Sequence, residues 1–167
     1  MAQYCVTSAS NLARKPRRLT HTEDASVPIG ALTAWQALFD QAKLHAGERV
    51  LVHGGAGSVG VFAIQLARIQ GAQVITTASE RNLDFAQQLG AEQVIDYRSV
   101  RFEESVRKVD FVLVDTDGGE TLERSWAVLK AGGRWSSTTG RATSKLQACR
   151  WSIRTRCFRQ GSGSMSG

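Results

Sequence analysis

The sequence has no long apolar run, and this limits where the protein can work. No stretch approaches the ~20 consecutive apolar residues that a bilayer-spanning helix requires, so we expect no membrane partner. Residues 1–19 also lack the continuous apolar segment of a secretory signal. They are rich in Arg and Ser and free of acids, as a mitochondrial presequence is, but their apolar residues interrupt the basic amphipathic pattern of such a leader. We therefore expect no targeting segment and a cytoplasmic protein.

Cysteine is scarce. The chain has three cysteines, Cys5 near its start and Cys149 and Cys157 near its end. They provide neither the closely spaced ligands of a structural zinc nor the framework of a disulfide-stapled secreted domain. The three histidines are scattered too, and His53 is expected to satisfy backbone groups. We therefore expect no metal site.

Acidic residues are absent from the last part of the chain. Between Arg134 and Gly167 there are seven basic residues and no acid, which leaves 14 basic and 15 acidic residues in the first 133. Residues 141–167 also lose all periodicity and end in a Gly/Ser tract, so a basic, disordered tail is expected. Charge runs of this kind often lack a site, so we do not expect nucleic acid as a partner. The alternative is that the tail binds an anionic polymer, with Trp151 and Phe158 stacking between its cations.

Strands alternate with helices through the middle of the chain. Strands are predicted at residues 49–54, 72–78, 92–97, 109–116 and 134–139. Helices are predicted at residues 29–43, 58–70, 81–90, 102–108 and 120–133. Residues 1–27 read as a lead-in, with a strand at 3–8, a loop at 14–24 and Pro28 opening the first helix. The alternation predicts an α/β fold, a doubly wound parallel sheet with helices on both faces.

A glycine cluster joins the first of these strands to the next helix. Gly55, Gly57 and Gly60 form the pattern G-x-G-x-x-G, which between a strand and a helix is typical of dinucleotide binding. The first glycine permits the sharp turn, the second lets the backbone approach a pyrophosphate, and the third lets helix and strand pack closely. The alternative is a tight turn without a ligand. A P-loop is excluded, because Val61 and Phe62 stand where Lys and Ser or Thr would be required.

The end of the second strand indicates which dinucleotide fits. A site for NAD usually has an acid there, which holds the ribose 2′-hydroxyl. Here Ser79 and Arg81 follow the strand, and a hydroxyl with a cation suits a 2′-phosphate. NADP is therefore favoured over NAD. Glu80 is the alternative contact, because its carboxylate could accept from a ribose hydroxyl or simply favour the first turn of a helix.

Several segments resemble a known family in the family's own order. The stretches "VPIGALTAWQAL", "RVLVHGGAGSVGVFAIQLAR", "LGAEQVIDY" and "VDFVLVDTDGGETLERSWAVLKAGG" are similar to the zinc-independent medium-chain dehydrogenase/reductases, in the NADPH:quinone oxidoreductase branch. The resemblance covers residues 3–139. It implies a Rossmann-type NADP-binding domain over residues 28–140 and a remnant of the GroES-like catalytic domain over residues 1–27.

The resemblance also implies roles for individual residues. The pyrophosphate would lie on Gly55, Ala56, Gly57, Ser58, Val59 and Gly60. The 2′-phosphate would be held by Ser79 and Arg81, with Tyr97 beside it, although Tyr97 could equally be an ordinary aromatic at a strand end. Thr33 would lie beside the nicotinamide, and Asp115 and Gly118 would line the cofactor cleft. Ile29 occupies a position where zinc-dependent relatives have a ligand.

The activity implied by the resemblance is hydride transfer from NADPH to a quinone or an activated alkene. Most of the family's catalytic domain has no counterpart in the sequence, so turnover by this chain alone is not expected and no catalytic residue is assigned. A dinucleotide-binding module without catalysis is the alternative. The resemblance further implies a homodimer, although the strand that pairs in it lies beyond the similar residues.

Overall fold

A five-stranded parallel sheet forms the centre of the computed structural model, which describes residues 5–114 and 119–138. The strands are β1 (Arg49–His53), β2 (Gln73–Ala78), β3 (Gln93–Asp96), β4 (Val109–Val114) and β5 (Leu129–Ser137). They lie in the order β3-β2-β1-β4-β5, and each adjacent pair is parallel. The predicted parallel sheet is confirmed.

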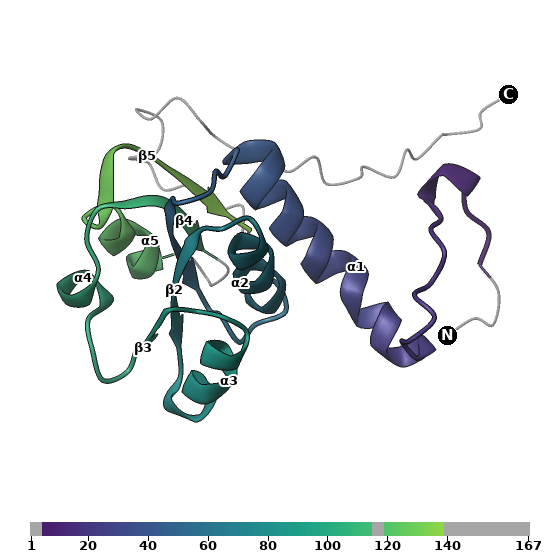
Figure 1. Ribbon diagram of the computed structural model, residues 1–167, viewed down its shortest axis with the longest axis horizontal. Helices are drawn as coiled ribbons and strands as arrows, with labels where there is room; N and C mark the ends of the chain where they lie inside the picture. Colours follow the sequence, from purple (N-terminus) through teal and green to yellow (C-terminus); the bar gives the residue numbers. More distant parts are fainter. Residues whose placement is uncertain (1–4, 115–118, 139–167) are drawn as a thin grey trace, which may run out of the picture.

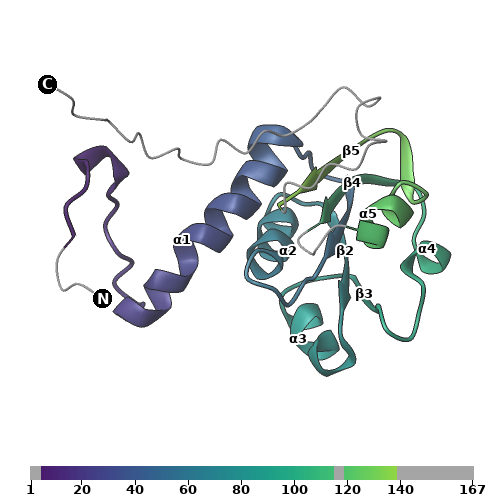
Figure 2. The same cartoon turned by 180° about the vertical axis from the view of Figure 1, so that it is seen from behind.

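Helices cover both faces of the sheet, as the alternating pattern predicts. Their bounds are η1 (Ala9–Asn11), α1 (His21–Trp35), η2 (Gln36–Gln41), α2 (Gly60–Ile69), η3 (Glu80–Asn82), α3 (Leu83–Gln88), α4 (Phe102–Ser105) and α5 (Gly119–Ser125). Figures 1 and 2 show α1, α2 and α3 on one side of the sheet and α4 and α5 on the other. The result is a doubly wound α/β domain of Rossmann type.

The core consists of two apolar clusters, one on each face of the sheet. Side chains of consecutive strand residues point to opposite faces, so neighbours in one strand join different clusters. The cluster under α1, α2 and α3 includes Val50, Val52, Ile64, Val74 and Leu113. The cluster under α4 and α5 includes Leu51, Ile75, Phe102, Val112 and Leu122. Because strands β1, β2 and β4 are buried on both faces, their sequences read as nearly continuous apolar runs.

The first helix begins well before its predicted start. Helix α1 starts at His21, so the loop predicted at residues 14–24 is confirmed only as far as residue 20, and the predicted helix start at residue 29 is wrong. The cause is a capping box: the Thr20 hydroxyl accepts the Glu23 N–H, and the Glu23 carboxylate accepts the Thr20 N–H. Pro28 lies inside the helix, where it removes one backbone hydrogen bond without ending it. After Trp35 the chain continues as the π-helical η2.

Other predicted bounds also shift. Helix α2 begins at Gly60, two residues later than predicted, and residues 5–8 form no strand. Helix α5 ends at Ser125, because Leu129 already pairs with Val109 in the sheet. Strand β5 then reaches its main register only at Arg134, after an irregularity in which Gly132 has a φ of 77°. The helix predicted over residues 120–133 is therefore a short helix followed by the start of a strand.

Candidate functional site

The glycine loop lies where the strand order reverses. Strand β1 has β2 on one side and β4 on the other, so the chain leaves β1 toward one edge and later returns on the opposite side. In open α/β sheets, ligands bind outside the carboxyl ends of the strands at such a point. Residues 54–59 connect the carboxyl end of β1 to the N-terminus of α2 at this point.

Three glycines shape the loop. Gly54, the residue before the G-x-G-x-x-G motif, makes the turn with a left-handed φ of 72°. The prediction that Gly55 makes this turn is therefore wrong. A β-carbon on Gly55 would lie 2.1 Å from the Thr76 hydroxyl oxygen of β2. A β-carbon on Gly60 would lie 2.2 Å from the Gly54 carbonyl oxygen. The close packing predicted for Gly60 is therefore present, and Gly55 is required for the approach to β2.

A single residue of β2 holds the start of the loop. The Thr77 carbonyl accepts the N–H of Gly55 at 3.0 Å, and the Thr77 hydroxyl accepts the N–H of Gly54 at 3.3 Å. Gly57 then closes a turn by donating its N–H to the Gly54 carbonyl at 2.8 Å. The first half of the loop is thus fixed to the sheet and to itself.

The second half of the loop presents donors. Val61 makes the first hydrogen bond of α2, to the Gly57 carbonyl at 3.0 Å. Within residues 5–114 and 119–138, no hydrogen-bond acceptor is found for the backbone N–H groups of Ser58, Val59 and Gly60. Ser58 is exposed, and Val59 and Gly60 follow it as buried residues at the start of α2. Together with the positive end of the α2 dipole, these N–H groups can bind an anion.

Helix α1 lies against this loop. A β-carbon on Gly30 would lie 2.3 Å from the Ser58 carbonyl oxygen and 2.9 Å from the Phe62 ring, so α1 approaches α2 through a residue without a side chain. Thr33 lies one turn later on the same face of α1 and is half-buried. The structure therefore places Thr33 on the face of α1 that carries Gly30.

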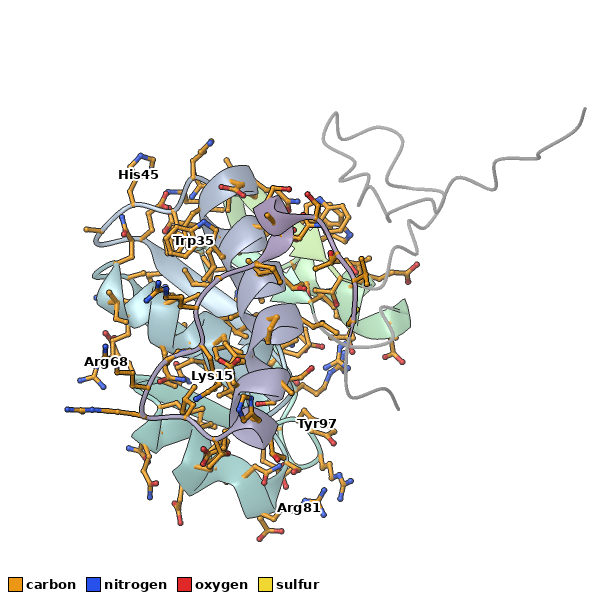
Figure 3. The ribbon with its side chains drawn as sticks, turned by 90° about the vertical axis from the view of Figure 1, so that its right-hand side faces the viewer. Lys15, Trp35, His45, Arg68, Arg81 and Tyr97 are labelled. Atoms are coloured by element: carbon orange, nitrogen blue, oxygen red, sulfur yellow. The ribbon has the colours of Figure 1, made fainter. Side chains whose placement is uncertain are left out.

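Ser79, Arg81 and Tyr97 lie together at the carboxyl ends of β2 and β3. Ser79 is half-buried and its hydroxyl accepts from the Asn82 amide at 3.2 Å, while Arg81 is exposed. The Tyr97 N–H donates to the Ala78 carbonyl at 3.3 Å, which places Tyr97 beside the end of β2. Figure 3 shows Arg81 and Tyr97 at the same end of the molecule. Arg98, which sequence reasoning missed, lies 5.8 Å from the centre of the Tyr97 ring.

The acid of the sheet nearest to the end of β2 already accepts hydrogen bonds from its own turn. Asp96 pairs in register with Ala78, one strand away from the position where an acid would meet a ribose. Its carboxylate accepts the Ser99 hydroxyl at 2.5 Å and the Arg98 N–H at 3.1 Å, and these bonds lower the pKa of Asp96. Asp96 therefore caps its own turn.

His53 is buried at the end of β1 and does not bond the backbone, which corrects its predicted role. Its Nδ1 lies 3.2 Å from the Thr77 hydroxyl oxygen and its Nε2 lies 3.0 Å from that of Ser125. The ring also packs edge-on against Phe102, with centroids 4.6 Å apart. Burial, and secondarily Arg124, lowers the pKa of His53 to about 4, so the ring is neutral at physiological pH.

Sequence reasoning missed Gly30, Thr77 and Ser125, because their roles depend on which elements come together. Asp115 and Gly118 lie outside the described residues, as do the tail at residues 141–167 and two of the cysteines. No cluster of three or more metal-ligating side chains occurs in residues 5–114 and 119–138. None of the helices in the part of the chain that the structure describes could cross a membrane.

Comparisons with known proteins agree with this geometry. A family model described as zinc-binding dehydrogenase matches residues 58–155. The chain is 40% identical over 151 residues to a probable zinc-binding oxidoreductase, mitochondrial, of Arthroderma benhamiae. The aligned region covers 82% of this chain and 45% of that protein. It is also 40% identical over 146 residues to the NAD(P)H oxidoreductase RTN4IP1, mitochondrial, of Bos taurus. That aligned region covers 83% of this chain and 36% of that protein. The chain thus spans less than half the length of these relatives.

A solved structure has the same fold at higher identity. The quinone oxidoreductase from Coxiella burnetii superposes with a TM-score of 0.70 and 44% identity, over 75% of this chain and 39% of that one.

The curated relatives correct the expected location. Both are named as mitochondrial, and this overturns the expectation of a cytoplasmic protein. That expectation gave too much weight to the apolar residues of an Arg- and Ser-rich segment without acids, which is also the composition of a mitochondrial leader.

Proposed function

The chain belongs to the zinc-binding dehydrogenase family of medium-chain dehydrogenase/reductases, and from this membership we propose that it binds a nicotinamide dinucleotide at the glycine loop as part of an NAD(P)H-dependent oxidoreductase. The observation that carries the proposal is that the first half of the loop is hydrogen-bonded to the sheet, whereas the second half has N–H groups that can bind a ligand. Gly54 and Gly55 are fixed to β2 by Thr77, while the N–H groups of Ser58, Val59 and Gly60, at the positive end of α2, have no acceptor among the described residues. A rigid row of donors of this kind suits a pyrophosphate.

We further propose that NADPH is preferred over NADH. The half-buried Ser79 hydroxyl and the exposed Arg81 guanidinium follow β2, where a 2′-phosphate would lie, with Tyr97 alongside. Asp96, the acid nearest in the sheet, already accepts from the Ser99 hydroxyl and the Arg98 N–H, and the exposed Glu80 remains the alternative contact for a ribose hydroxyl. A cation and a hydroxyl favour the phosphate, whereas a free carboxylate there would favour the hydroxyl.

The proposed reaction is reduction of a quinone or an activated alkene. When bound, the cofactor supplies a hydride from its nicotinamide ring, and the protein supplies binding and orientation. Thr33, on the face of α1 that meets the glycine loop, would border the nicotinamide. The described residues do not fit a zinc ion, since Ile29 has no ligating atom and no cluster of ligands is present among them, so no step is assigned to zinc.

Titration of the full chain with NADPH and NADH, followed by nicotinamide fluorescence, tests the binding proposal. Saturable binding with a lower Kd for NADPH is expected. Equal Kd values would reject the preference for NADPH, and absence of binding by both would reject the dinucleotide site itself.

Turnover needs a separate assay, because the chain spans only 36–45% of the length of the curated relatives. NADPH oxidation is followed at a series of quinone and enone concentrations. Saturable oxidation supports the oxidoreductase. Binding without oxidation of NADPH supports the second candidate function, a dinucleotide-binding module without catalysis.

A further inference from the structure

Among the described residues, His53 is the one buried titratable side chain beside the glycine loop that the proposed function leaves unused. It is 1% exposed and lies directly before Gly54. Both ring nitrogens have hydroxyl partners from other elements: Thr77 on β2 and Ser125 on α5. A buried polar side chain with two specific partners fixes those partners as much as they fix it.

The hydrogen-bond partners determine which ring nitrogen carries the proton. The Ser125 hydroxyl donates its only proton to the Thr121 carbonyl at 2.6 Å, so it can only accept from His53. His53 Nε2 must therefore be the donor, and Nδ1 of the neutral ring must be the acceptor.

The consequence reaches the glycine loop through Thr77. With Nδ1 as acceptor, the Thr77 hydroxyl donates to the ring, and its lone pairs are turned toward the Gly54 N–H, which donates to it at 3.3 Å. The hydrogen bonds then run in one direction from Gly54 through Thr77, His53 and Ser125 to Thr121 of α5. Reversing the tautomer would leave a hydroxyl proton and a ring nitrogen without suitable partners.

We propose that His53 is a positioning residue, which orients the Thr77 hydroxyl so that the glycine loop is held ready for the cofactor phosphates. This rests on the proposed dinucleotide site. The role requires a neutral ring, and the groups packed around it keep it neutral. Phe102 of α4 excludes water, Arg124 of α5 disfavours the charged ring, and Glu103 of α4 opposes Arg124 only in part.

Variants of Thr77 in the full chain test the proposal. Thr77→Val removes the hydroxyl and leaves both the Gly54 N–H and His53 Nδ1 without a partner, whereas Thr77→Ser keeps the hydroxyl. Val74→Ala is the matched control, because it removes buried atoms from the same strand, three residues before Thr77. We expect Thr77→Val to raise the Kd for NADPH about tenfold or more, while Thr77→Ser and Val74→Ala stay close to the parent protein.

Two spectroscopic measurements do not depend on the cofactor. Nitrogen chemical shifts of the His53 ring are expected to report the Nε2–H tautomer in the parent protein at pH 7. Amide hydrogen exchange at Gly54 is expected to be faster in Thr77→Val than in Val74→Ala. Because the chemical-shift measurement uses the unmodified chain, it tests the tautomer of His53 even if Thr77→Val does not fold.

The outcomes separate this proposal from the proposed function. An Nδ1–H tautomer, or a folded Thr77→Val with unchanged NADPH binding and unchanged Gly54 exchange, overturns the role of His53 and leaves the cofactor site standing. If the parent chain binds neither NADPH nor NADH, the proposed function fails. Faster amide exchange at Gly54 in Thr77→Val would then still support the conclusion that the Thr77 hydroxyl holds the glycine loop. Unchanged exchange would overturn that conclusion as well.

Discussion

Gly30 of α1 and Ser58 of the glycine loop meet with no room for a side chain between them. A β-carbon on Gly30 would lie 2.3 Å from the Ser58 carbonyl oxygen, which is backbone and cannot rotate away. Helix α1 therefore reaches the glycine loop through its own backbone, and Figure 1 shows it extending beyond the sheet on that side.

Replacing Gly30 by alanine should separate α1 from α2. Alanine favours a helix by about 1 kcal/mol over glycine, but the overpacked contact is expected to cost more, for a net loss of about 1–3 kcal/mol in the free energy of unfolding. Urea unfolding measures the effect. Thr22→Ala, at an exposed position of the same helix, is the control and should be neutral or slightly stabilising. Equal stability of the two variants would show that α1 does not rest on the loop.

Gly55 and Gly60 should respond differently to the same substitution. The main obstacle to Gly55→Ala is the Thr76 hydroxyl, which a second change to Thr76→Ala removes, and the end of the Ile64 side chain, 2.9 Å away, must also shift. The obstacle to Gly60→Ala is the Gly54 backbone. Each single variant is expected to lose about 1–3 kcal/mol of stability. The double variant Gly55→Ala/Thr76→Ala should be more stable than the sum of its single changes predicts. Gly60→Ala combined with Thr76→Ala should be additive, and coupling there would contradict the assigned contacts.

The sheet and its glycine loop could be predicted from the sequence because their signals are local. Buried parallel strands are continuous apolar runs, and the glycine pattern follows one of them directly. The capping box of Thr20 and Glu23 was also readable, but Pro28 is typical of a first helical turn and indicated a later start. Here a strong N-cap outweighed the cost of a single interior proline.

The partners of His53 could not be predicted in this way. Its ring reaches Thr77 and Ser125, which lie 24 and 72 residues away in sequence. Those contacts depend on strand register and on the placement of α5, which no local pattern encodes. The turn at Gly54 was missed for a related reason: three glycines close together allow several positions for the left-handed residue, and packing against β2 selects one.

The ion pair of Glu103 and Arg124 should make stability depend on acid pH. Arg124 donates to both Glu103 oxygens, at 2.7 and 2.6 Å, and this hydrogen bonding lowers the pKa of Glu103 to about 2. Since the folded-state pKa lies below the unfolded one, the stabilisation is complete above about pH 4.5 and is lost as the pH falls toward 2. Glu103→Gln should cost about 1–3 kcal/mol at pH 7, with a gap that shrinks below pH 4.5.

Glu104→Gln is the matched control for that measurement. Glu104 is on the same helix, but its carboxylate lies 3.9 Å from Arg101 and both side chains are 67% exposed. An exposed pair of this kind is worth less than about 1 kcal/mol, so the control should unfold close to the parent protein at every pH. A Glu103→Gln gap that stayed constant down to pH 2 would show that lost packing, and not lost charge, causes the destabilisation.

Arg81 should decide between the two cofactors. The guanidinium is exposed after β2, where a 2′-phosphate would accept its hydrogen bonds. Arg81→Gln is expected to raise the Kd for NADPH by about tenfold and to leave the Kd for NADH unchanged, since NADH has no phosphate there. Arg107→Gln is the control. It removes the same charge at the amino end of β4, whereas Arg81 follows the carboxyl end of β2, so it should change neither Kd. An equal loss of NADPH affinity in both variants would mean that net charge, and not a contact with Arg81, attracts the cofactor; an unchanged Kd in Arg81→Gln would remove this residue from the site.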